Sequence, residues 1–423
     1  MNVYFAGIGG VGIGPLAHIA RKAGYRITGS DESESPVTRE LAKTGATIHI
    51  GAQTGEFLRQ QQSQTPFDYF VYTAALPPDH PELATAHQLG LRCVKRDGLL
   101  ARILSDKRLD MIAIAGTHGK TTTTGLLVWV MKQLSLPVSY SVGTTLSFGP
   151  SGDFDPESEL FVYECDEYDR NFLHYTPRLS VITAIDYDHP DTYPTEGEYI
   201  QAFCDFINQS DKTLLWQKDL DRLAHASFEN DVTAYEPSTQ LAHIHLPGLY
   251  LRQNAFLVER AVLQLFPQTP YHDLIEAINQ FPGTSRRMER LDELLYSDYA
   301  HHPDEIRAAL QAAREIAESV VAVYQPHQNV RQHRMRDLYT DCMELADEVY
   351  WLPTYLTRED PDLPVLSPEE LAKNLTNHAV VKQADLNDQL IRDINAARSA
   401  GKLVVCMGAG SIDSWVRQHI VAS

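Results

Sequence analysis

One segment constrains the fold of this chain more than any other: a short apolar strand that leads into a glycine-rich turn and then a helix. Residues 111–116 read MIAIAG, and GTHGKTTTT follows at residues 116–124. In such a turn the backbone amides point toward phosphate oxygens, Lys120 neutralises the terminal phosphates and the Thr121 hydroxyl ligates Mg²⁺. The segment therefore predicts a nucleotide-binding loop. The usual pattern has glycine at position 114, where this chain has Ile114, so the loop is a shortened variant.

The same alternation of short apolar strands with helix-like stretches extends along the whole chain. Strands are predicted at residues 3–8, 25–31, 68–76, 91–96, 111–116, 160–167, 179–185, 319–325, 346–352, 378–382 and 402–410. Strands that alternate with helices form parallel sheets in α/β folds. Composition shifts near residues 107 and 283 divide the pattern into three parallel sheets. We therefore expect an α/β protein with domains at residues 1–107, 108–283 and 284–423.

Size and charge restrict the class of partner. A chain of 423 residues is too long for one ordinary core, and its formal net charge of −20 argues against binding to nucleic acid or to an anionic membrane. It has five scattered cysteines without a CxxC pair, no basic signal segment at MNVYFAGIGG and no apolar run of about 20 residues. We expect a soluble, cytoplasmic protein with reduced thiols, and the sequence does not predict its oligomeric state.

A second glycine turn, GIGGVG at residues 7–12, follows the first predicted strand and precedes a helix. Gly7, Gly9 and Gly12 fit the dinucleotide fingerprint, and Asp31 ends the second strand, where a ribose contact is expected. The turn predicts a diphosphate site. The residues leave open whether the ligand is a nicotinamide dinucleotide, as in a dehydrogenase, or another nucleotide. A glycine turn that only eases helix–sheet packing is the structural alternative.

Polar residues gather where other predicted strands end. YECDEYD (163–169) and DYDHPDTY (186–193) place carboxylates and His189 at the edge where α/β sheets bind their ligands. A carboxylate there can hold the Mg²⁺ of a nucleotide. The alternatives are a solvated acidic face and a structural histidine.

Three further turns have the same character: GTSRR (283–287), SDYAHHPDE (297–305) and QPHQNVR (325–331). The guanidinium groups of Arg286 and Arg287 can reach a phosphate. Each turn alone is also explained by helix capping, but two polar turns at one sheet edge favour a site.

Together these motifs resemble the Mur ligases, the ATP-dependent amide-forming enzymes of peptidoglycan precursor synthesis. The resemblance covers essentially the whole chain, in the order GIGGVG, GSD, GTHGKTTTT, ECDEYD, DH, GTSRR, DYAHHP, YQPH and GAGSI. It implies a Rossmann-like N-terminal domain for a UDP-sugar, a central P-loop ATPase-like domain and a Rossmann-like C-terminal domain for the incoming amino acid. ATP and Mg²⁺ are the implied cofactors.

Within the family, the tail motifs YQPHQNVR and MGAGSID resemble the branch whose substrates are UDP-N-acetylmuramate and L-alanine. The branch that adds a murein tripeptide shares the GTHGK and DEYD spellings and is the alternative. In either branch a phosphoryl group activates the sugar-borne carboxylate as an acyl phosphate, so the C-terminal domain is expected to exclude water. A nucleotide-binding switch without catalysis is a further alternative, because LRQNAFLV (251–258) departs from the family's GRHNxxNA at Leu251, Gln253 and Leu257.

The resemblance also implies roles for individual residues. The implied UDP-sugar contacts are Gly9, Gly10, Val11, Gly12 and Asp31. The implied ATP contacts are Gly116, Thr117, His118, Gly119, Lys120, Thr121, Thr122, Asn254, Arg286 and Asp298. Thr121 and Glu164 are implied ligands of one Mg²⁺, and Glu164 and His189 of a second. The implied catalytic residues are Lys120, His301, His327 and Arg331, with one of the two histidines as the proton acceptor. Gln328 replaces an arginine that is common in the family.

Overall fold

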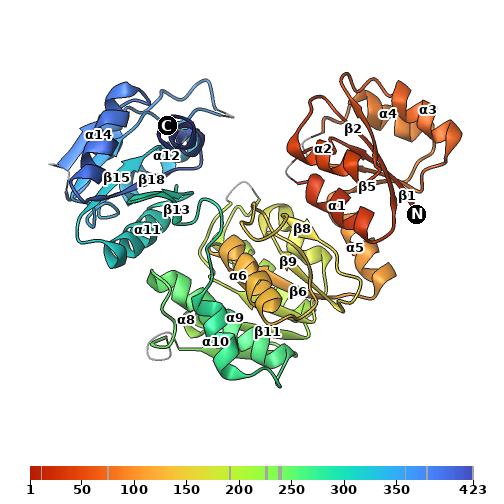
Figure 1. The fold of residues 1–423 in the computed structure, drawn as a ribbon, viewed down its shortest axis with the longest axis horizontal. Coiled ribbons are helices and arrows are strands. Elements are labelled where there is room, and N and C mark those ends of the chain that lie inside the picture. Colours follow the sequence, from red (N-terminus) through yellow and green to blue (C-terminus); the bar gives the residue numbers. More distant parts are fainter. Residues whose placement is uncertain are drawn as a thin grey trace. The chain divides into compact units, whose positions relative to one another are not determined.

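A computed structural model describes residues 1–10, 12–73, 76–189, 192–223, 227–236, 241–357, 359–377 and 380–421. The chain forms two compact units. Figure 1 labels the helices and strands along it. One unit comprises Met1–Thr239 and Leu257–Ile278, and the other comprises Gln240–Phe256 and Asn279–Ser423. The fold is α/β with three sheets, as the sequence predicts.

The first sheet has five parallel strands in the order β3-β2-β1-β4-β5. Its strands are β1 (Asn2–Ala6), β2 (Arg26–Asp31), β3 (Thr47–Ile50), β4 (Tyr69–Tyr72) and β5 (Cys93–Lys95). Its helices are α1 (Gly14–Lys22), α2 (Pro36–Lys43), α3 (Glu56–Gln64), α4 (Pro81–Gln88) and α5 (Arg96–Lys107). Alternate residues of β1 enter different cores: Val3 and Phe5 pack with α1, α2 and α5, whereas Tyr4 and Ala6 pack with α3 and α4. Helices therefore cover both faces, which is typical of a parallel sheet.

The second sheet has the order β12-β11-β10-β6-β9-β7-β8. Its strands are β6 (Asp110–Ala115), β7 (Ser139–Ser141), β8 (Gly152–Asp153), β9 (Leu160–Glu164), β10 (Leu179–Ile182), β11 (Lys212–Trp216) and β12 (Asp231–Tyr235). The helical segments in this part of the chain are α6 (Lys120–Gln133), the 3₁₀ segment η1 (Tyr168–His174), α7 (Glu196–Gln209), α8 (Gln217–Arg222), α9 (Leu249–Leu265) and α10 (Tyr271–Asn279). Only the edge strand β8 is antiparallel among the described strands of this sheet.

The third sheet has the order β13-β14-β18-β15-β16-β17. Its strands are β13 (Glu289–Asp292), β14 (Leu295–Asp298), β15 (Val320–Tyr324), β16 (Glu348–Trp351), β17 (Val381–Gln383) and β18 (Leu403–Met407). Its helical segments are α11 (Pro303–Ile316), α12 (Asn329–Met335), η2 (Arg336–Leu338), α13 (Pro368–Ala372), α14 (Asp388–Ser399), α15 (Ile412–Val416) and the π-helical η4 (Arg417–Val421). The prediction of a wholly parallel third sheet is wrong at β13, which pairs antiparallel with β14 through a two-residue hairpin turn, Glu293 and Leu294.

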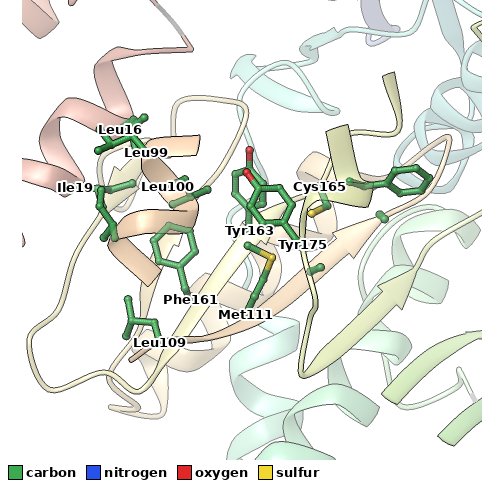
Figure 2. Close-up of a cluster of buried hydrophobic side chains, with 14 of the residues drawn as sticks. Leu16, Ile19, Leu99, Leu100, Leu109, Met111, Phe161, Tyr163, Cys165 and Tyr175 are labelled. Carbon is green, nitrogen blue, oxygen red and sulfur yellow. The ribbon is translucent and has the colours of Figure 1, made fainter. Parts of the chain in front are cut away.

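One apolar cluster joins the first two sheets. Leu16 and Ile19 of α1 and Leu99 of α5 belong to the same buried cluster as Phe161 and Tyr163 of β9 (Figure 2). Burial of apolar surface contributes about 25 cal/mol per Å², so a shared core of this kind stabilises the arrangement of the two sheets.

Candidate active site

The predicted nucleotide-binding loop connects β6 to α6, and two glycines shape it. Gly116 has φ +128°, and a Cβ atom there would lie 2.5 Å from Thr183 Oγ1 and 2.8 Å from the Ala184 carbonyl oxygen. Gly119, which precedes α6, has φ +83°. Both backbones lie in a region that L-residues with side chains rarely adopt. The loop therefore requires glycine at these two positions, and its last residue opens directly into the helix N-terminus, where anions bind.

The other loop residues anchor it to the end of β10. The Thr117 hydroxyl donates to the Asp186 carbonyl oxygen at 2.7 Å and accepts from the Asp186 amide at 2.8 Å. The Thr183 hydroxyl donates to the His118 carbonyl oxygen. These contacts hold the loop in one conformation, which is the property expected of a preformed phosphate site.

The threonine run divides into two functions. Thr123 and Thr124 are buried, and their hydroxyls donate to the carbonyl oxygens of Gly119 and Lys120 at 2.9 and 2.8 Å. These two hydroxyls therefore form hydrogen bonds at the start of α6. Thr121 donates instead to Glu164 Oε1 at 2.7 Å, at the end of β9, and Thr122 is partly exposed on the first turn.

Lys120 lies folded against its own loop. Its Nζ atom donates to the Gly116 carbonyl oxygen and to Glu167 Oε2, both at 2.7 Å, and lies 3.8 Å from Asp166 Oδ1. Burial lowers the pKa of Lys120, but the carboxylates of Glu167, Asp166 and Glu164 outweigh it and raise the pKa above its ordinary value. The ammonium group is therefore charged at neutral pH.

Glu164 is the residue that the predicted sites of both Mg²⁺ ions share. Its Oε1 atom accepts the Thr121 hydroxyl, and its Oε2 atom accepts the Gly143 amide at 2.7 Å. A Cβ atom at Gly143 would lie 2.8 Å from the carboxylate, so glycine is needed for this approach. The carboxylate is thus oriented toward the first turn of α6.

A second group of potential metal ligands lies beside it: Asp166, Glu167 and His189 each offer one ligand atom within 4.8 Å of the others. Glu167 is fully buried, and its Oε1 atom has no hydrogen-bond partner among the described residues. His189 Nε2 lies 3.7 Å from that atom. A buried carboxylate oxygen without a hydrogen bond has a desolvation cost in free energy that a bound cation would offset. Mg²⁺ binds through one or two carboxylates. The residues present therefore fit a divalent cation.

Sequence reasoning singled out Glu164 and His189 but missed the roles of Asp166 and Glu167. The signal was present in the acidic run at 163–169, yet a run of carboxylates does not show which side chain turns inward. Beyond β9 the chain leaves strand geometry, with Asp169 and Arg170 at φ +53° and +58°. His189 itself has φ +55°, an uncommon conformation for a residue with a side chain.

The glycine turn of the first sheet is braced by Asp31. The Gly9 amide donates to Asp31 Oδ2 at 2.8 Å, and a Cβ atom at Gly9 would lie 2.7 Å from Ser35 Oγ. At Gly12, Arg96 Nη1 lies 3.5 Å from such a Cβ, and apart from Gly12 and its two chain neighbours no other described residue has an atom within 4 Å. Gly10 lies in the same turn and its amide donates to the Gly7 carbonyl oxygen. Val11 lies outside the described residues.

In the other unit, Arg286 and Asp298 are fixed near the ends of β14 and β18. Arg286 has φ +57°, donates from Nη2 to the Gly408 carbonyl oxygen at 2.6 Å and lies over the Tyr299 ring at 4.6 Å. Its buried Nε atom has no hydrogen-bond partner within the described chain and lies 3.8 Å from Asp413 Oδ2, so a carboxylate of the protein already faces it. Asp298 accepts from the amides of Met288 and Ala300, and burial raises its pKa to about 6.

The two predicted histidines and Arg331 share one environment. The His301 and His327 rings are 6.3 Å apart, and His327 stacks on Tyr355 at 5.7 Å. Burial and the positive charge of Arg331 lower both histidine pKa values; for His327 the value is about 4, with His301 as a further cause. His301 Nδ1 lies 3.2 Å from Glu305 Oε2. Both imidazoles are therefore neutral at pH 7.

The predicted residues thus fall into three groups. The loop residues, Glu164 and His189 lie around the second sheet, and Gly9, Gly10, Gly12 and Asp31 lie at the carboxyl edge of the first. The third group belongs to the other unit and includes Asn254, a mostly buried residue of α9. The group around the second sheet therefore has a charged lysine in its loop, and the third group has two neutral histidines beside an arginine.

Comparison with known proteins agrees with this arrangement. Models of the Mur ligase family match residues 2–108 (Mur ligase family, catalytic domain), 114–256 (Mur ligase middle domain) and 286–410 (Mur ligase, glutamate ligase domain). A UDP-N-acetylmuramate–L-alanine ligase from Nocardioides is 33% identical over 97% of this chain and 94% of its own length. A ligase of the same name from Porphyromonas gingivalis is 32% identical over 98% and 97%.

Solved structures share the fold. The UDP-N-acetylmuramate–alanine ligase of Thermotoga maritima aligns with a TM-score of 0.75 at 23% identity, covering 99% of this chain and 98% of that one. A murein peptide ligase from Psychrobacter arcticus aligns with a TM-score of 0.63 at 23% identity, covering 100% and 98%.

Fold and loop together define an ATP-dependent ligase that forms amide bonds and acts on small molecules. The chain belongs to the Mur ligase family. None of the described helices combines the length and apolar character that a bilayer span requires.

Proposed function

We propose that this enzyme joins L-alanine to the lactyl carboxylate of UDP-N-acetylmuramate in peptidoglycan precursor synthesis. The observation that carries the substrate assignment is its similarity to L-alanine ligases, at 33% identity over 97% of the chain. The reaction belongs in the cytoplasm, and the five unpaired cysteines agree with a reducing compartment. The domains proposed for it are 1–107, 108–283 and 284–423.

ATP would be held by the loop at the start of α6. Gly116, Thr117, His118 and Gly119 supply the turn, and Lys120 and Thr122 lie on the first turn of the helix. Bound ATP supplies the phosphoryl group that turns an unreactive carboxylate into an acyl phosphate. The charged Lys120 stabilises the negative oxygens that approach each other in this transfer. Asn254, Arg286 and Asp298 are proposed as further ATP contacts.

Mg²⁺ would be held by Thr121 and Glu164, and a second ion by carboxylates with His189. The support is the unsatisfied, fully buried Oε1 atom of Glu167 beside His189. Bound Mg²⁺ supplies positive charge that offsets the repulsion between phosphate and carboxylate. The protein orients the Glu164 carboxylate through hydrogen bonds from the Gly143 amide and the Thr121 hydroxyl.

The sugar nucleotide is assigned to the first glycine turn. Gly9, Gly10, Val11 and Gly12 would approach its diphosphate, and Asp31 braces the turn through the Gly9 amide. This assignment leaves no role for a nicotinamide cofactor.

L-Alanine is assigned to the turns after β14 and β15. Arg331 would bind its carboxylate, and neutral His301 or His327 would accept the proton that the amine loses. A pKa of about 4 makes free His327 a weak base. A bound carboxylate beside Arg331 would raise that pKa, because it cancels the positive charge that lowers it.

The second candidate is a ligase that adds a murein tripeptide. It is favoured by the GTHGK and DEYD spellings and agrees with the fold of the Psychrobacter enzyme. ADP release with UDP-N-acetylmuramate separates the two when L-alanine, glycine, L-serine and the tripeptide L-Ala-D-Glu-meso-diaminopimelate are compared. L-Alanine is expected to give the highest kcat/KM. A preference for the tripeptide would assign the enzyme to the branch that recycles murein peptides. ATP binding without ADP release in the presence of any acceptor would indicate a nucleotide-binding switch without catalysis.

A further inference from the structure

We infer that Arg96 binds the diphosphate of the sugar nucleotide, and that Tyr163 and Tyr175 set its position through Asp97. The inference rests on the proposed function, which places a diphosphate at the first glycine turn. It adds to the turn a cationic group that comes from the last helix of the first sheet.

The position of Arg96 follows from the topology. It is the first residue of α5, directly after β5, so it starts at the carboxyl edge of the first sheet, where β1 also ends. Its Nη1 atom lies 3.5 Å from the place that a Cβ atom on Gly12 would occupy. Apart from Gly12 itself and its two chain neighbours, no other described residue has an atom within 4 Å of that place. The open side of Gly12 therefore faces a guanidinium group.

The charge of the turn requires such a group. Asp31 already places a carboxylate against the Gly9 amide, and that carboxylate repels a diphosphate. The glycine turn itself contributes only amide dipoles. Arg96 supplies a full positive charge beside Gly12, and a guanidinium fork matches two phosphate oxygens at once.

The hydrogen bonds of Arg96 leave this fork available. Its Nε atom donates to Asp97 Oδ1 at 3.2 Å. Its two terminal nitrogens have no hydrogen-bond partner among the described residues, and 36% of its side chain is exposed. The guanidinium is thus held by one edge, while its other edge is free to bind a ligand.

Asp97 is in turn held by the second sheet. Its Oδ1 atom accepts the hydroxyls of Tyr163 and Tyr175, each at 3.3 Å, in addition to Arg96 Nε. The two tyrosine rings meet edge to face in the shared apolar cluster, with centroids 5.3 Å apart and an interplanar angle of 69° (Figure 2). Tyr163 immediately precedes Glu164 in β9. One strand therefore positions both the proposed magnesium ligand and, through Asp97, the proposed diphosphate ligand.

The test compares UDP with uridine, because only UDP carries the group that Arg96 would bind. Dissociation constants are measured by calorimetry for UDP and by ligand-observed NMR for uridine, on the full chain. R96Q is expected to weaken UDP binding by about 10- to 100-fold, the range for a hydrogen-bonded charge, and to change uridine binding by less than about twofold. R96K retains the charge but not the fork, so its affinity for UDP should lie between those of the wild type and R96Q.

Arg102→Gln is the matched control. It removes the same charge from the same helix, where Arg102 pairs with Asp106 and about half of its side chain is exposed. UDP affinity should not change in this variant. An equal loss of UDP affinity in R102Q and R96Q would overturn the inference, because the net charge of the protein alone would then explain the loss.

The positioning role is tested by the double variant Y163F/Y175F, which removes both hydroxyls and keeps both rings. It should weaken UDP binding about three- to tenfold and leave the affinity for a non-hydrolysable ATP analogue within about twofold. UDP affinity equal to wild type would remove the tyrosines from the inference. Wild-type affinity in both R96Q and R96K would overturn the role of Arg96, and it would leave the proposed function intact. Absence of UDP and UDP-N-acetylmuramate binding in the wild type would overturn both.

Discussion

Glu167 binds the ammonium group of Lys120 from inside the protein. Its Oε2 atom lies 2.7 Å from Lys120 Nζ, and its side chain has no exposed surface. The residue at the centre of the nucleotide-binding loop is thus half of a buried ion pair. In such a pair the removal of one partner leaves the other charge buried and uncompensated.

The first prediction concerns this pair. Lys120→Met should abolish ATP-dependent amide formation and also lower the free energy of unfolding by about 3–5 kcal/mol, because Glu167 loses its counter-charge. Adding Glu167→Gln should restore part of that stability, with a coupling energy of about 1–3 kcal/mol. Urea denaturation of the single and double variants measures both quantities. Lys43→Met removes an exposed lysine at the end of α2 and serves as the control. A Lys120→Met protein as stable as this control would contradict the prediction.

The Lys120–Glu167 pair also shows what the sequence predicts and what it does not. The loop, its strand and its helix follow from local pattern, since MIAIAG and GTHGK contain both the apolar run and the glycines that the backbone requires. The partner of the lysine cannot be predicted in this way, because the local sequence does not distinguish between the four carboxylates at positions 164–169. The structure shows that Glu167 is the carboxylate that is fully buried, just before the left-handed residues Asp169 and Arg170, and no local pattern marks this.

The same limit applies to Arg96. In sequence it is one residue of the ordinary-looking stretch LRCVKRDGLL, 84 positions from Gly12. Only the strand order, which brings the carboxyl ends of β1 and β5 to one edge of the first sheet, places it at the glycine turn. In the third sheet the polar turns after β14 and β15 were predictable as a site edge, whereas the antiparallel β13 was not, since its sequence ERLD lacks an apolar run.

The second prediction concerns the magnesium requirement. Glu164→Gln keeps the size of the side chain but removes the charge; its amide oxygen can still accept the Gly143 amide, while its NH2 group would donate to the Thr121 hydroxyl instead of accepting from it. We expect the Mg²⁺ concentration for half-maximal activity to rise at least about tenfold, because Mg²⁺ binds through carboxylates. Titration of activity with Mg²⁺, and of bound Mn²⁺ by electron paramagnetic resonance, measures the change. Glu159→Gln, at an exposed position before β9, is the control, and an unchanged Mn²⁺ affinity in Glu164→Gln would refute the assignment.

The third prediction separates two glycines of one turn. Gly9→Ala places a methyl group 2.7 Å from Ser35 Oγ and 2.8 Å from a Thr38 methyl group, so it should destabilise the fold by about 1–3 kcal/mol. Gly12→Ala meets only Arg96 Nη1 at 3.5 Å and should keep nearly wild-type stability. It should nevertheless weaken UDP binding at least about tenfold, because the methyl group fills the space assigned to the diphosphate. Thermal melts with and without UDP distinguish the two effects, and a Gly12→Ala variant that binds UDP normally would argue against a ligand at that space.

The fourth prediction follows from Asp298. Burial raises its pKa from 3.8 to about 6, against the opposing effects of Arg287 and of two backbone amides. The folded state therefore holds a proton between pH 4 and 6 that the unfolded state releases, so this contribution to stability is full below pH 3.8 and is lost as the pH rises through 6. A shift of about two units corresponds to about 3 kcal/mol. Asp298→Asn is neutral at every pH, so the stability of the wild type relative to this variant should fall by up to that amount between pH 4 and 7.

Asp292 supplies the control of opposite sign for that experiment. Its pKa is lowered by the Glu293 amide and by Arg398, so its contribution to stability is present above its unfolded pKa and is lost as the pH falls through its folded pKa. Relative to Asp292→Asn, the wild type should therefore gain stability with rising pH. Urea denaturation of the three proteins in steps from about pH 3 to pH 7 tests both slopes, because the Asp292 contribution changes below its unfolded pKa of 3.8 and the Asp298 contribution changes between pH 3.8 and about 6. If the Asp298 and Asp292 variants gave slopes of the same sign, burial could not be the cause that raises the pKa of Asp298.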